Sequence, residues 1–239
     1  MLWYKFWLES RLRFLLSLAG LVLFAAFFVL LTDRYGVLPR PAKEYRMQLF
    51  IAHQYLVGLW MLSIVLLGMG GLLRERATGI SQFTLALPAE RIRLVCVRFG
   101  VYLAESIALA LAPWIALVLI THLTGQQWSF REALFFDSLL IGGGLAFVGL
   151  TTLVSSLVEG EYTAPVVAFG IIVVMQVASN LVSWLKPLDF WRLEGGFNCI
   201  DPNTWLLVRP FPWAQILVSL SFLLIALAAS IRAIERREF

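Results

Sequence analysis

The chain has 239 residues, of which 60% are hydrophobic and only 14% charged, with a formal net charge of +4 at neutral pH. A soluble domain carries about 25% charged residues, so a soluble fold of this composition could not cover its apolar core with a polar shell. Nucleic-acid binding is not indicated either, because the basic residues are scattered among many segments. The composition predicts a single all-α membrane domain, residues 1–239, in which helices satisfy every backbone group.

Residues 1–13 have the pattern of an amphipathic helix that precedes the first crossing. Charged residues of alternating sign recur at i, i+4 and i+8 on one side, and they are Lys5, Glu9 and Arg13. Aromatic residues follow helical spacing on another side, and they are Trp3, Phe6 and Trp7. This pattern predicts an elbow helix in the headgroup layer. It serves either as a plain membrane anchor or as a contact for a cytosolic partner.

Six uncharged apolar segments follow, each close to the roughly 20 residues that a helix needs to cross a bilayer. They form a predicted bundle over residues 14–232, and their ranges are 14–32, 47–73, 99–124, 138–158, 162–185 and 213–231. In this interpretation Glu105 is the only carboxylate within a crossing. The crowded glycines Gly142, Gly143, Gly144 and Gly149 predict tight packing within the bundle, with a dimer seam as the less favoured alternative.

Six crossings place both termini on one side of the membrane. If that side is the cytosol, the inside segments hold 11 Lys and Arg residues and the outside loops hold 8. The positive-inside rule therefore predicts cytosolic termini, including the basic tail 233–239. The long outer segment 186–212 mixes aromatic residues with glycine and proline. It predicts short interfacial helices that dip partly into the membrane as a re-entrant segment.

The segment between the second and third crossings, residues 74–98, is rich in arginine and longer than a plain connector needs to be. A charged cluster ends the second crossing, a glycine permits a change of direction, a short apolar run follows, and an arginine leads into the third crossing. The residues in these places are Arg74, Glu75, Arg76, Gly79, Phe83, Leu85, Leu87 and Arg91. The pattern predicts a short helix parallel to the membrane that docks on a cytosolic protein.

This order resembles the permease subunit of type-2 ATP-binding-cassette transporters. The matching places are the cluster 74–76, Thr78-Gly79, the apolar run 83–87, Pro88 and Arg91. The amphipathic start, six crossings, long last outer loop and basic tail match as well, so the resemblance covers essentially the whole chain. Its motifs are loose, and Ala89-Glu90 stand where relatives often have a small residue and a serine.

The resemblance implies an exporter in the bacterial cytoplasmic (inner) membrane. Two permease chains, as a homodimer or heterodimer, would form the pathway among membrane lipids, and two cytosolic ATPase subunits would drive it. The segment 74–91 would be the main coupling helix, and Glu159 and Glu161 would make a second, smaller contact. ATP and Mg²⁺ would be bound by the partner ATPase. This chain has no phosphate-binding loop, so we expect no catalysis and no cofactor in it.

Three polar residues within the crossings are candidates for the pathway: His53, Glu105 and His122. An ionisable residue inside a membrane suggests function by default. The alternative for Glu105 is a shallow glutamate that packs against a basic neighbour, and for the histidines a structural role within the bundle. No second metal ligand stands at helical spacing from either histidine, so no metal site is predicted.

Three other functions remain open at this point. An ion-driven carrier is one, although internal repeats and broken helices are not apparent. A non-transporting assembly subunit is another. A membrane-embedded enzyme is less favoured, because the nucleophile or His-Glu metal motifs that such chemistry needs do not occur. The cargo is not indicated by any residue.

Overall fold

The computed structural model describes residues 2–34, 42–68, 91–123, 130–158, 162–201, 205 and 210–236. The long helices within these residues are α1 (Leu2–Arg34), α2 (Ala42–Leu67), α5 (Arg91–Leu123), α6 (Phe130–Leu157), α7 (Thr163–Leu181) and α9 (Trp213–Glu235). Two short ones, the 3₁₀ helix η1 (Ser183–Leu188) and α8 (Phe190–Glu194), lie between α7 and α9. Six helices in this part of the chain are long and apolar enough to cross a membrane, as a multi-pass membrane protein requires.

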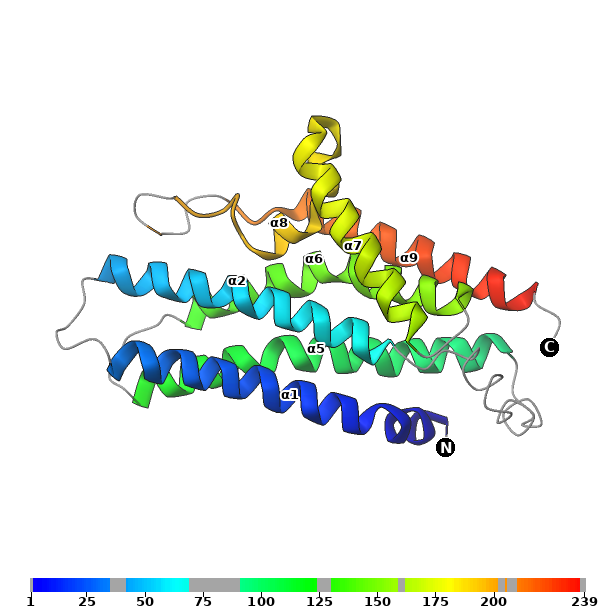
Figure 1. The fold of residues 1–239 in the computed structure, drawn as a ribbon, viewed down its shortest axis with the longest axis horizontal. Helices are drawn as coiled ribbons and strands as arrows, with labels where there is room; N and C mark the ends of the chain where they lie inside the picture. The colour runs from blue at the N-terminus through cyan, green and yellow to red at the C-terminus, as the bar shows by residue number, and fades with distance from the viewer. Residues whose placement is uncertain are drawn as a thin grey trace.

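The long helices run alternately up and down the bundle, and both ends of the chain lie at the same end of it (Figure 1). The end of α2, the beginning of α5, the end of α6 and the beginning of α7 lie there as well. We call this the terminal end, and the other the distal end. Helix α7 crosses the others at a steep angle (Figure 1). Each of the six predicted crossings corresponds to one long helix.

Three helices begin earlier than the charge pattern predicts, and the first is α2, which begins at Ala42 rather than at residue 47. Helix α5 begins at Arg91 rather than at residue 99, and α6 begins at Phe130 rather than at residue 138. Helix α6 therefore contains Asp137, which is 3% exposed. The interpretation of Glu105 as the only carboxylate within a crossing is wrong, because a charged side chain near the end of a span does not oblige the helix to stop there.

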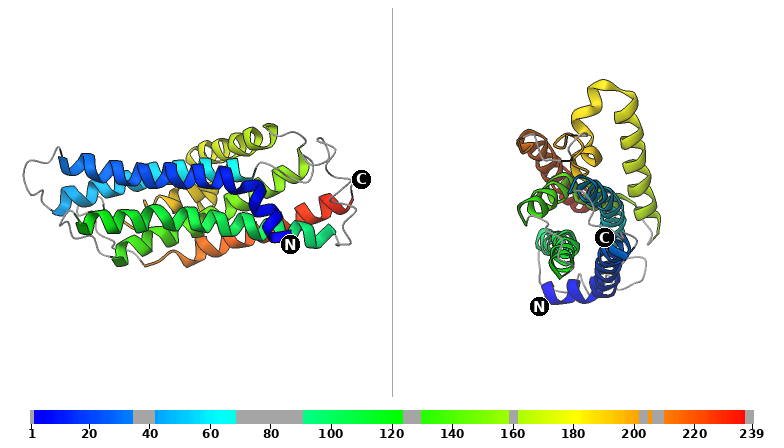
Figure 2. Two further views of the ribbon diagram at one scale, coloured as in Figure 1. Left: turned by 90° about the horizontal axis from the view of Figure 1, so that it is seen from below. Right: turned by 90° about the vertical axis from the view of Figure 1, so that its left-hand side faces the viewer.

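Helix α1 is continuous from Leu2 to Arg34, so no break separates residues 1–13 from the first crossing. Instead, the first turns bend away from the axis of the remaining helix (Figure 2). We call residues 2–13 the N-terminal arm. Its Phe6 is buried against Leu94 and Val101 of α5, whereas Trp3 and Trp7 are 55% and 41% exposed. The arm lies against α5 with one apolar side and leaves its tryptophans at the surface.

Helix α6 is the centre of the bundle, and its glycines allow the neighbouring helices to approach it. A Cβ atom added to Gly149 would lie 2.9 Å from the Cα atom of Leu223 in α9. One added to Gly142 would lie 3.0 Å from the side chain of Ile216. Ser219 of α9 also bridges to α6, because its hydroxyl donates to the Gly143 carbonyl at 3.0 Å and accepts from the Ala146 amide at 3.0 Å. The prediction of tight packing within the bundle is confirmed.

Candidate functional site

Two polar clusters lie inside this apolar bundle. One surrounds Glu105 near the terminal end, where the N-terminal arm meets α5. The other surrounds His53 and Glu194, in the half of α2 toward the distal end. Burying polar side chains in an apolar bundle costs free energy unless they are paired, so both clusters are candidates for function.

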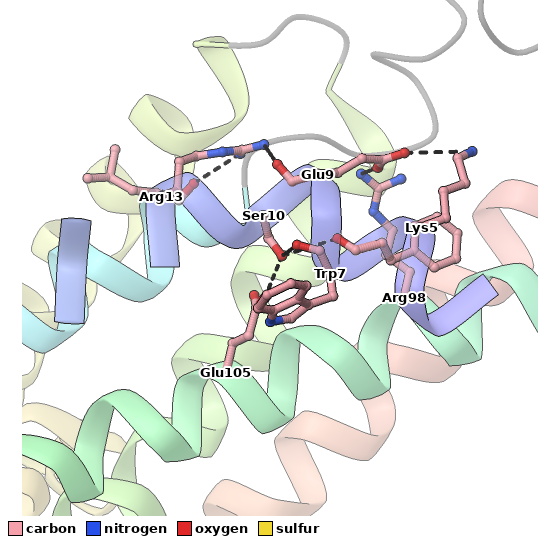
Figure 3. Close-up of polar contacts among 9 residues, drawn as sticks. Lys5, Trp7, Glu9, Ser10, Arg13, Arg98 and Glu105 are labelled. Carbon is pink, nitrogen blue, oxygen red and sulfur yellow. Dashed lines mark hydrogen bonds and ion pairs between the residues drawn. The ribbon is translucent and has the colours of Figure 1, made fainter. Parts of the chain in front are cut away.

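Glu105 belongs to α5 and is 5% exposed. The hydroxyl of Ser10, on the N-terminal arm, donates a hydrogen bond to its Oε1 atom (Figure 3). The hydroxyl oxygen of Ser10 also lies 3.1 Å from the carbonyl oxygen of Phe6, one turn earlier in the arm. The arm therefore reaches the carboxyl group directly, over a separation of 95 residues in sequence.

Charged residues join the arm to its neighbours beside this hydrogen bond. Glu9 forms ion pairs with Lys5 at 3.6 Å and with Arg98 of α5 at 3.8 Å (Figure 3). The guanidinium group of Arg98 also lies 5.4 Å from the centre of the Phe6 ring, within the range of a cation–π contact. Arg13 donates to the Leu66 carbonyl of α2 at 3.4 Å. These contacts hold the arm against both α5 and α2.

The charged groups line a cavity of about 80 Å³, which we call the arm cavity. Its polar walls come from the arm, α5, α6 and α9, and include Ser10, Arg13, Arg98, Glu105, Ser155, Ser156 and Ser230. Two guanidinium groups and two carboxyl groups, Glu9 and Glu105, thus face one space. Such a cavity can bind a small group that carries both a positive and a negative charge. Arg13 and Arg98 line the same cavity as Glu105, so basic side chains do lie near this carboxyl group.

His53 is fully buried on α2, and its ring lies 5.4 Å from the ring of Trp114 and 4.8 Å from the ring of Phe136, which stack on each other. Its Nε2 atom lies 2.7 Å from the carbonyl oxygen of Glu194. Because a carbonyl can only accept, Nε2 carries the hydrogen of this bond. The next residue, Gln54, donates from Nε2 to the Gly195 carbonyl at 2.8 Å. Two consecutive residues of α2 thus hold the end of α8.

Glu194, at the end of α8, is also fully buried. Neither of its carboxyl oxygens has a hydrogen-bond partner among the described residues. Burial raises the pKa of this carboxyl well above its ordinary value, which favours the neutral form. Glycines of α6 make room for it, since a Cβ atom on Gly143 would lie 2.6 Å from the Glu194 Cγ atom. Glu194 was not predicted as a site residue, although the glycine run 142–144 signalled a close approach by some segment.

The structure does not bring the three predicted pathway residues together. Glu105 lines the arm cavity, while His53 lies in the cluster with Glu194. His122 is exposed in the last turn of α5. No hydrogen bond or ring contact joins the two histidines within the described part of the chain. There, too, no three His, Cys, Asp or Glu side chains come together as metal ligands do.

Most of the predicted coupling residues lie outside the described residues, and these are Arg74, Glu75, Arg76, Gly79, Phe83, Leu85, Leu87, Glu159 and Glu161. Arg91 is the first residue of α5. What the structure places is the helices that flank these segments. Helices α2 and α5 flank the first coupling segment, and α6 and α7 flank the second. All four helices reach the terminal end (Figure 1).

Comparisons with known proteins find no family, no curated protein and no solved structure that matches this chain.

Proposed function

We propose that this chain is the membrane-spanning permease subunit of an ATP-driven exporter. A second permease chain completes the pathway, and two separate cytosolic ATPase subunits drive it. The observation that carries the proposal is the position of the arginine-rich segment. The two helices that flank it, α2 and α5, meet it at the end of the six-helix bundle where both termini also lie (Figure 1). The larger share of Lys and Arg residues is on this side, which supports a cytosolic location.

The helices that flank the segment are bonded to each other within the apolar core. The hydroxyl of Tyr102 in α5 donates to the Ile64 carbonyl of α2 at 2.8 Å. The indole of Trp60 in α2 donates to the Ser106 carbonyl of α5 at 3.0 Å. Both donors are buried, where water cannot compete for the bonds. A force applied to the connecting segment is therefore transmitted to α2 and α5 as one unit, as coupling to a motor protein requires.

A second candidate function is an ion-driven carrier, and the buried carboxyl of Glu194 is the observation that favours it. Ionisable residues inside a bundle often serve proton relays. In that case transport would collapse when a protonophore removes the proton gradient and would need no ATPase. ATP-driven export would continue under the same treatment in vesicles supplied with ATP.

The direct test is to delete residues 80–87 and to co-purify the variant with the ATPase subunit of the proposed exporter. We expect the complex to be lost while the variant remains monodisperse in detergent. A matched control deletes residues 36–39 in the first outer loop and keeps the complex. An intact complex after the first deletion would show that this segment is not the coupling contact.

The orientation has its own test, which uses the two native cysteines. Cys96, near the start of α5, is exposed, and Cys199 is buried. A membrane-impermeant maleimide is expected to label Cys96 in inside-out vesicles and not in right-side-out cells. Labelling of Cys96 from outside the cell would place the arginine-rich segment on the wrong side for an ATPase.

A further inference from the structure

We infer that the N-terminal arm and the first half of α5 form a binding site for one phospholipid molecule with an ammonium-bearing head group. The arm cavity would hold the head group, and an apolar groove beside it would hold an acyl chain. This site is independent of the transport proposal, because a membrane protein of any function can bind a resident lipid.

The groove has a volume of about 520 Å³ and lies between the arm and α5. Its walls are mostly aromatic or small, and they are Trp3, Tyr4, Trp7, Phe14, Ala104 and Ala108. The two alanines stand four residues apart on α5 and therefore share one helix face, where their short side chains leave space. An apolar groove lined by tryptophan and tyrosine suits a hydrocarbon chain at the membrane interface.

The groove and the arm cavity adjoin each other. Val101 and Glu105 line both of them, so the polar and the apolar space meet along one stretch of α5. The ring of Trp3 packs against α5 at Gly100, since a Cβ atom added to Gly100 would lie 2.6 Å from the Trp3 ring. A charged compartment that continues into an apolar groove matches a ligand with a charged head and an apolar tail.

The charges of the arm cavity indicate the type of head group. Arg13 and Arg98 present guanidinium groups, whose forked donors match a phosphate. Glu9 and Glu105 present carboxyl groups to the same cavity, which suits a positive group and disfavours a head group with only negative charge. A primary ammonium has three N–H donors for these oxygens, whereas a trimethylammonium has none.

The bend of α1 creates this site. Phe6 holds the arm on α5, and the hydrogen bond from Ser10 to Glu105 lies at the junction of the two compartments (Figure 3). A straight α1 would carry Trp3, Tyr4 and Trp7 away from α5 and leave neither compartment closed. The arm is therefore a part of the lipid site as well as a membrane anchor.

The test is native mass spectrometry of the full chain released from nanodiscs. These contain equal amounts of dioleoyl phosphatidylethanolamine, phosphatidylcholine and phosphatidylglycerol. We expect one phosphatidylethanolamine to be retained per chain, about tenfold over phosphatidylcholine, the ratio that one charge-assisted hydrogen bond supplies. Glu105→Gln and Arg13→Gln should each reduce this retention about tenfold. The control variants Glu132→Gln and Arg131→Gln change like residues in the first turn of α6, at the distal end, and should retain the lipid.

A second measurement does not depend on the charge variants. Phosphatidylethanolamine with brominated acyl chains should quench the fluorescence of Trp3 and Trp7, and the W3F/W7F double variant should lose that part of the quenching. Equal retention of phosphatidylethanolamine and phosphatidylcholine, or unchanged retention in Glu105→Gln, would overturn the inference. So would quenching that is the same in W3F/W7F as in the wild type.

Discussion

Gly144 of α6 offers the sharpest test of the packing described above. A Cβ atom at this position would lie 2.0 Å from Cη2 and 2.3 Å from Cζ3 of Trp60, whereas ordinary contact begins at 3.4 Å. Trp60 is 2% exposed and cannot move aside freely, because its indole nitrogen is bonded to the Ser106 carbonyl at 3.0 Å. Gly144→Ala must therefore displace the indole ring or separate α2 from α6.

The size of the effect follows from three contributions. Overpacking of a core costs about 1–3 kcal/mol, and loss of the Trp60 hydrogen bond costs about 1 kcal/mol more. Replacing glycine by alanine within a helix stabilises the helix by about 1 kcal/mol. The net expectation is a loss of about 1–3 kcal/mol, which corresponds to a decrease of roughly 3–10 °C in the unfolding midpoint for a chain of this size.

The assay is thermal unfolding in detergent, followed by intrinsic tryptophan fluorescence and by the monodisperse fraction in size-exclusion chromatography. The control is Gly170→Ala in α7, where nothing lies within 4 Å of the added Cβ atom, so the midpoint should stay the same or increase slightly. If Gly144→Ala unfolds at the same temperature as Gly170→Ala, the indole of Trp60 does not rest against this glycine and the reasoning is refuted.

Three more predictions follow from single contacts. Ser219→Ala removes the bridge from α9 to two backbone groups of α6 and should destabilise the protein by about 1–2 kcal/mol, whereas Ser221→Ala, which removes a bond within α9 only, should change the unfolding midpoint little. Phe6→Ala removes the buried contact of the arm and should increase hydrogen exchange of residues 2–13, while Leu12→Ala, 67% exposed, should not; equal exchange in both variants would mean that Phe6 does not hold the arm. Because burial raises the pKa of Glu194, the folded state retains a proton that the unfolded state has released above the ordinary glutamate pKa. The stability of the wild type should therefore fall as the pH rises from the ordinary glutamate pKa to the raised pKa of Glu194. The unfolding midpoint of Glu194→Gln should depend less on pH over the same range. Identical slopes of the unfolding midpoint against pH in the two proteins would contradict a raised pKa for Glu194.

The six crossings could be predicted from the sequence because the apolar segments between charges have the length that a bilayer requires. Their beginnings could not be predicted in the same way. Arg91 and Arg93 belong to the first turn of α5, before the predicted crossing begins, and Asp137 is buried inside α6. A charge marks the end of an apolar run, whereas backbone hydrogen bonding decides where the helix ends.

The candidate sites depended on contacts that are distant in sequence. The helical pattern of residues 1–13 predicted that Phe6 and the charged residues take different sides, and Glu9 does pair with Lys5 one turn away. The partner of Ser10 lies 95 residues further along the chain and that of His53 lies 141 residues away. Glu194 stands in a segment that the sequence places outside the crossings. Its burial follows only from how α8 packs on the glycines of α6.

The hydrogen bonds from His53 and Gln54 to the end of α8 have a mechanical consequence. Helix α2 is bonded to the end of α8 at its middle, through His53 and Gln54, and its last residues lead into the arginine-rich segment through residue 68. A helix transmits displacement along its axis with little compression. A push of a few ångströms at the terminal end of α2 would thus also displace the end of α8, without any signal having to cross the apolar core from one helix to the next.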